Sequence, residues 1–95
     1  MKVLVQKDCL GGERIVELEL DRPLLLTDLD RLEGVETRVV LDHLPRPFFK
    51  LDVPTRYLVT GIVGDRRLRV TVRLALREAA VPTALAVAAS LLGAS

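Results

Sequence analysis

The strongest constraint on the fold comes from residues 57–75, where two apolar runs flank a glycine–aspartate pair. The runs YLVTGIV and RLRVTVRLA alternate apolar and polar residues, and Gly64 and Asp65 lie between them. Alternation with a period of two predicts β-strands, and a glycine-containing pair between two such runs predicts a β-hairpin. We therefore expect the chain to build a sheet with antiparallel neighbours.

The register of this hairpin has two solutions in the sequence. A two-residue turn pairs Tyr57 with Val72, whereas a three-residue loop places Leu58 beside Val72. Because a shift of one residue exchanges the two faces of a strand, the pattern leaves open whether Tyr57 belongs to the core or to the surface.

Other short segments also have the composition of strands. Residues 14–20 (RIVELEL) alternate cleanly, and a Gly11-Gly12 turn joins them to the strand-like residues 2–7. Pro45 and Pro47 follow the strand-like residues 35–41, so a continuous central strand through this corner is excluded. The remaining predicted strands are residues 35–41 and 49–53.

A change of period between residues 21 and 34 predicts a first helix. Asp21 is a possible cap, Pro23 suits the first turn, and Gly34 is placed to end the helix, which gives about three turns. An alternative start at Thr27 leaves a single turn. The apolar stripe of this helix consists of Leu25, Leu29 and Leu32.

The second predicted helix lies between Pro82 and Gly93 and carries no charge. Proline near the start and glycine past the end bracket about ten helical residues. A helix that is apolar on all sides is expected to be buried, either across a sheet or against a second copy of the protein. The segment is shorter than the roughly 20 apolar residues that span a bilayer, so we expect no membrane contact.

Together these elements predict one α+β domain over residues 1–95. Short connections favour an antiparallel or mixed sheet of about five to six strands with two helices packed on it. The stretch LEGVETRVV, in which a helix ends on glycine and valine opens the next strand, is similar to many ferredoxin-like domains. That resemblance implies a loosely ferredoxin-like arrangement, although the second crossover helix of that fold has no obvious segment here.

Composition places this domain among folded proteins of a reducing compartment. The chain has 49% hydrophobic residues and a formal net charge of +1, unlike disordered chains. Its single cysteine cannot form an internal disulfide, and the N-terminus lacks the long apolar region of a secretory signal. We therefore predict a cytoplasmic location.

Arg67, Arg69 and Arg73 share one face of the predicted strand within residues 66–73 and are the candidate contacts for an anion or a nucleic acid. Single-stranded nucleic acid usually meets such a stripe beside aromatic stacking platforms. Only Tyr57 can serve as one, in one of the two registers, and the pI of about 7.9 is not markedly basic. We favour a solvated strand face whose arginines meet Glu17, Glu19 or Asp52.

Catalysis has little support in the sequence. Cys9 beside Gly11-Gly12 suggests a thiol enzyme with His43 as base and Asp42 as orienting group. However, adjacent residues such as Asp42 and His43 tend to point to opposite faces of a strand, and free cysteine is usually buried. We name no catalytic residue, and the thiol enzyme stays an alternative.

No cofactor or metal is expected either. The chain lacks both the dinucleotide and the nucleoside-triphosphate glycine motifs. One cysteine and one histidine cannot complete a structural zinc site within one chain. The carboxylates Glu17, Glu19 and Asp21 are more simply a hydrated acidic face than a site for a hard cation.

The three aromatic residues are the candidate contacts for a partner. Phe48 and Phe49 are adjacent, so alternation directs one ring to the core and the other outward. Tyr57 is the third. We predict a non-catalytic protein- or ligand-binding or regulatory domain whose partner is a second copy or another protein, and the alternative is a nucleic-acid binder.

Overall fold

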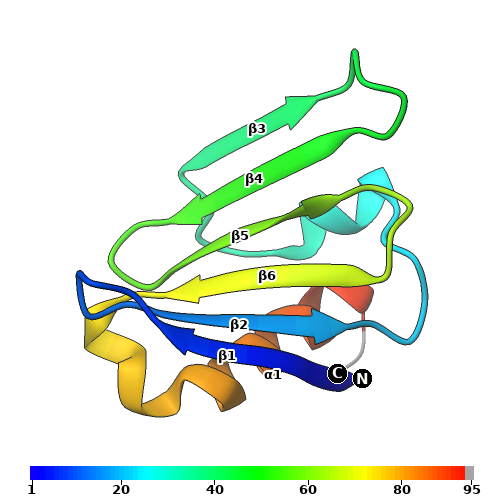
Figure 1. Ribbon diagram of the computed structural model, residues 1–95. Helices are drawn as coiled ribbons and strands as arrows, with labels where there is room; N and C mark the ends of the chain where they lie inside the picture. The colour runs from blue at the N-terminus through cyan, green and yellow to red at the C-terminus, as the bar shows by residue number, and fades with distance from the viewer. Residues whose placement is uncertain (94–95) are drawn as a thin grey trace.

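A computed structural model describes residues 1–93 as a six-stranded antiparallel sheet with helical segments on one side (Figure 1). The strand order is β1-β2-β6-β5-β4-β3, so β1 and β3 form the two edges. The α+β class and the antiparallel sheet are confirmed. The strands are β1 (Lys2–Asp8), β2 (Arg14–Glu19), β3 (Thr37–Leu41), β4 (Phe48–Val53), β5 (Tyr57–Ile62) and β6 (Arg67–Val72).

The β5–β6 hairpin adopts the register of the two-residue turn. Tyr57 pairs with Val72 and Val59 with Val70, which places the Tyr57 ring on the core side, where it is 9% exposed. Gly64 takes a φ of +89° in the turn, a conformation that glycine adopts without steric cost. Beyond Ile62, Val63 donates its N–H to the carbonyl of Pro47, which continues the register of β4 and β5, and Asp65 donates its N–H to the carbonyl of Ile62 in the turn.

The covered face of the sheet holds the core. Inward side chains of the four central strands meet α1 (Ala80–Leu92), which packs against β2 and β6, and the 3₁₀ helix η1 (Leu26–Arg31). Figure 1 shows both helical segments behind the sheet. The ring of Phe49 is fully buried and lies against Gly61, where an added Cβ would come within 2.9 Å of it. Glycine at this position is therefore a packing requirement.

The predicted first helix of three turns is wrong for most of its length, and the alternative of a short helix starting at Thr27 is closer to the structure. Only η1 is helical, and Leu25 before it is extended and 56% exposed, although Leu29 and Leu32 are buried as the stripe predicted. Tertiary hydrogen bonds displace the first turns: Leu24 donates to the carbonyl of Asp65, and Gly64 donates to the carbonyl of Leu24. These bonds hold the segment against the β5–β6 turn.

The C-terminal helix is confirmed, and it lies across the chain's own sheet. Ala84, Val87, Ala88 and Leu91 are buried on its inner side, and Gly93 ends it with a φ of +76°. A second 3₁₀ helix, η2 (Leu74–Ala79), precedes it. By length and composition alone, residues 74–92 would suffice to cross a membrane. With one α-helix in the described chain, the second packed helix and the ferredoxin-like arrangement are not confirmed.

Candidate binding surface

No helix of residues 1–93 lies on the second face of the sheet, which we call the open face. Side chains that alternate with the core residues point to it from all six strands. Its β1, β2 and β6 side is rich in charged residues, whereas its β3, β4 and β5 side carries Val39, Leu41, Phe48, Leu58 and Ile62 beside the polar Thr37, Lys50, Asp52 and Thr60. An antiparallel sheet with one solvated face needs polar residues there, so the apolar residues require an explanation.

Four apolar residues form what we call the open-face patch. Leu41, Phe48 and Ile62 are consecutive neighbours across β3, β4 and β5, and Val39 adjoins them on β3. Val39 and Leu41 are each 38% exposed, and Phe48 and Ile62 are half-buried. The patch thus reaches from the middle of the sheet to its β3 edge.

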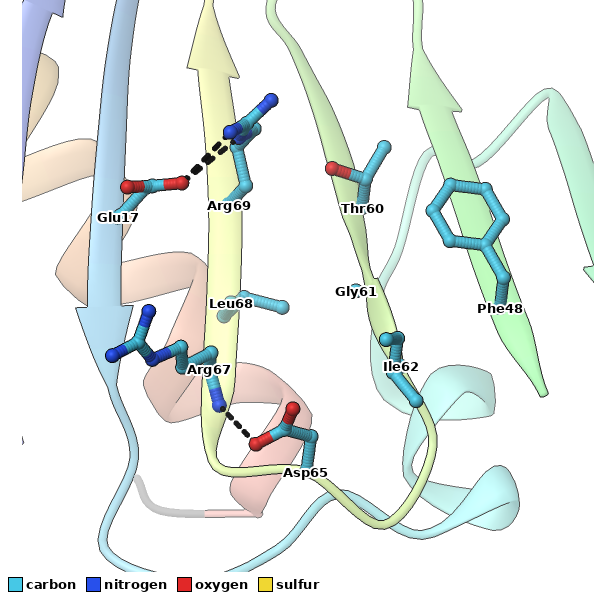
Figure 2. A pocket seen from close by; sticks show the side chains of 9 residues that line it. All are labelled: Glu17, Phe48, Thr60, Gly61, Ile62, Asp65, Arg67, Leu68 and Arg69. Carbon is cyan, nitrogen blue, oxygen red and sulfur yellow. Dashed lines mark hydrogen bonds and ion pairs between the residues drawn. The ribbon is translucent and has the colours of Figure 1, made fainter. Parts of the chain in front are cut away.

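A shallow hollow of about 290 Å³ lies between this patch and the arginines of β6 (Figure 2). Thr60, Gly61 and Ile62 of β5 line it, and the Phe48 ring stands at one side. On the other side Arg69 reaches toward Glu17, with 2.8 Å between Nη2 and Oε1. An apolar wall facing a compensated ion pair suits contact with a protein surface better than chemistry on a substrate.

The β6 arginines lie on the open face, as the alternation predicted, and two of the three are in ion pairs. Arg69 pairs with Glu17, and Arg73 with both Asp52, at 3.1 Å, and Glu13, at 3.5 Å. Among residues 1–93, Arg67 makes no ion pair, and its side chain extends toward β2 in Figure 2. Two of the guanidinium groups are thus already neutralised before any phosphate approaches.

The aromatic residue beside these arginines is Phe48 and not Tyr57. Register places Phe48 next to Ile62, and the hollow that these two residues line is also lined by Arg67 and Arg69. Phe49 and Tyr57 are core residues, at 0% and 9% exposure. Of the three aromatic candidates for partner contact, Phe48 alone is accessible, because alternation sends its ring to the open face.

The structure does not bring the proposed thiol site together. Cys9 is half-buried at the end of β1, and His43 follows β3, the strand at the opposite edge of the sheet. Five strand spacings of about 4.8 Å separate those edges, far beyond hydrogen-bond reach.

In the described chain no group of three His, Cys, Asp or Glu side chains could hold a metal ion. Glu17 is bound to Arg69, and Asp21 pairs with the N-terminal amine.

One buried charged cluster escaped the sequence analysis. Asp28 in η1 is 1% exposed and accepts hydrogen bonds from both Arg22, at 2.7 and 3.0 Å, and Arg31, at 2.6 Å. Arg22 and Arg31 also donate to the carbonyls of Leu92 and Leu91 at the end of α1. The cluster therefore ties η1 to the C-terminus of the helix. A structural role explains it fully.

The same hydrogen bonds determine how Asp28 titrates. Donation from Arg22, followed by the Leu25 N–H, lowers the pKa of Asp28 from its ordinary value of 3.8 to about 2, against the opposing effect of burial. The same bonds raise the pKa of Arg22. At the other end of the sheet, Arg14 and then Arg77 lower the pKa of the exposed Asp8.

This shift predicts a pH dependence of stability. The folded-state pKa of Asp28 is depressed, so its contribution is complete above the unfolded value near 3.8 and is lost as the pH falls toward 2. We expect the difference in unfolding free energy between the wild type and Asp28→Asn to shrink by about 2 kcal/mol across this window. Urea titrations of both proteins at several pH values measure it. A difference independent of pH would contradict the prediction.

Comparison with known proteins assigns no family to this chain. No protein-family model matches the sequence, and no curated protein or solved structure matches it either. A function therefore has to be argued from the open face itself, where the exposed apolar residues and the charges are placed by the register of the sheet.

Proposed function

We propose that this chain is a small, non-catalytic protein-binding domain that self-associates through the open-face patch. The observation that carries the proposal is the run of Leu41, Phe48 and Ile62 across three adjacent strands of a face that no helix of the described residues covers. A contiguous exposed apolar area rimmed by charges is typical of an interaction surface. The charged half of the face supplies that rim.

Self-association has further support from the placement of the other apolar surfaces. The uncharged C-terminal helix, the second candidate for an interface, already buries one side in the core. Other leucines, among them Leu10, Leu25 and Leu74, are more exposed but lie in loops and 3₁₀ segments, whereas the residues of the open-face patch adjoin one another across three strands. We further propose that the protein acts in the cytoplasm, where its single thiol stays reduced.

Nucleic-acid binding is the second candidate, and one observation favours it. Phe48 shares the open face with Arg67 and Arg69, which is the combination of a stacking platform and cations that single strands require. Against this, the carboxylates of Glu17, Glu13 and Asp52 occupy Arg69 and Arg73. Oligonucleotide binding that weakens with salt and with Arg67→Gln would support this candidate over protein binding.

Replacing Phe48 with glutamine tests the proposed function. We expect the folded domain to persist, because Phe48 lies outside the core, and the dissociation constant of the dimer to rise by about tenfold or more when the ring is lost. Light scattering at about 10 μM and about 500 μM protein brackets the range in which a modest interface associates.

Ile15→Gln is the matched control for this experiment. Ile15 is also a half-buried apolar residue of the open face, but it lies on β2 between Lys7 and Thr71. We expect Ile15→Gln to leave association unchanged. A wild-type protein that is monomeric at both concentrations, or equal effects of the two substitutions, would refute self-association through the patch.

A further inference from the structure

The two edges of the sheet differ in their protection against pairing with another strand. β1 contains a bulge between Val3 and Val5 and carries Lys2, Lys7 and Asp8. Bulges and charges are the usual means by which proteins block an edge. β3 is also short and carries one charge, Arg38, on the covered side, but it contains no bulge in its register with β4, and no strand of residues 1–93 lies on its outer side (Figure 1). Its edge is therefore available to a further strand.

The sequence of β3 is complementary to itself when read in the opposite direction. Arg38 and Val40 lie along one side of the strand, and Asp42, in the turn directly after it, follows at the same spacing. Within the chain Arg38 pairs with the exposed Asp30. Val39 and Leu41 alternate along the other. An antiparallel copy centred on Val40 sets Arg38 opposite Asp42 of the second molecule and Val39 opposite its Leu41. Opposite charges that face each other across strands are favourable, whereas like charges are not.

We propose that two copies of this chain join by antiparallel pairing of their β3 strands about a two-fold axis at Val40. The inference rests on the proposed self-association and specifies its geometry. The β3 edges then exchange main-chain hydrogen bonds, as in other cases of strand addition. Arg38 exchanges its exposed partner Asp30 for Asp42 of the second copy, and the two-fold axis forms this contact twice.

This arrangement also joins the two open-face patches. Leu41 of one copy adjoins Val39 of the other on the open side, and Phe48 lies directly behind Leu41. The two sheets merge into one, and the apolar halves meet at its centre while the charged halves lie outside. The register determines which residues are neighbours. If the two-fold axis lay at Val39 instead, Arg38 would face Val40 of the second copy and no opposite charge would lie across from it.

Cysteine cross-linking tests both the edge and its register. In a Cys9→Ser background, which removes the only native thiol, Val40→Cys places two sulfur atoms across the axis. Directly opposed residues have Cα atoms about 4.5–5.5 Å apart, within the range of a disulfide. We expect a mild oxidant to convert Val40→Cys into a covalent dimer at least about tenfold faster than Val39→Cys or the control Val5→Cys on the opposite edge.

The outcomes separate this inference from the proposed function. Faster cross-linking of Val39→Cys would overturn the register, and equal rates with a wild-type dimer would overturn the β3 edge while self-association stands. A wild-type monomer refutes both.

A second pair of variants needs no oxidant. Val39→Lys should raise the dissociation constant of the dimer by about tenfold or more, and Val5→Lys, at a similarly exposed position on β1, should not. Equal effects of these two would also overturn the inference.

Discussion

Replacing Asp28 with alanine is expected to lower the free energy of unfolding by about 3 kcal/mol. The substitution leaves the N–H of Leu25 without its acceptor and removes the carboxylate that holds Arg22 and Arg31 together. Both arginines are partly exposed, with 39% and 48% of the side chain accessible, so water recovers part of the loss. This keeps the expected cost below that of a fully buried ion pair.

Asp30→Ala is the matched control two residues further along η1. Asp30 pairs with Arg38, but its side chain is 66% exposed, and exposed pairs contribute less than about 1 kcal/mol. Urea unfolding of both variants, with the slope unchanged, measures the difference in stability. Similar midpoints for the two variants would show that the cluster around Asp28 does not hold η1 against α1.

The segment before η1 shows why sequence periodicity failed there. The leucine spacing fits a helix, but two interactions that the spacing does not reveal favour an extended chain. Leu24 exchanges backbone hydrogen bonds with the β5–β6 turn, and the Asp28 carboxylate accepts the N–H of Leu25. Those partners are distant in the sequence or act through a side chain. A signal was present in Asp28 itself, an acidic residue flanked by two arginines at positions 22 and 31. The sequence did not show that Asp28 is buried, because its burial depends on the packing of α1 against η1.

The strands were easier to predict because alternation reports directly on their two faces. Alternation predicted that Phe48 and Phe49 part to opposite faces, and that the β6 arginines share a solvated face. It also suggested Glu17, Glu19 and Asp52 as their partners. The ion pairs with Glu17 and Asp52 are present, whereas Glu19 makes none among residues 1–93. The position of β3 at an edge was beyond reach, since strand order depends on which distant segments pair. The binding surface proposed here depends on that order.

Replacing Phe49 with alanine is expected to destabilise the fold by about 4 kcal/mol. The ring is fully buried, and the cavity left behind faces Gly61, which has no side chain that could move into it. Cavities that cannot collapse lie at the high end of such costs.

Phe48→Ala provides the comparison, since it removes the same atoms from the next residue of β4 but from the open face. We expect that variant to lose about 1 kcal/mol or less, because solvent already reaches its ring. Thermal or urea unfolding of the two variants measures both values. Equal losses would mean that the open face is covered in the folded protein, and the surface proposed for self-association would then be part of the core. A large loss confined to Phe49→Ala instead leaves Phe48 free to act between molecules.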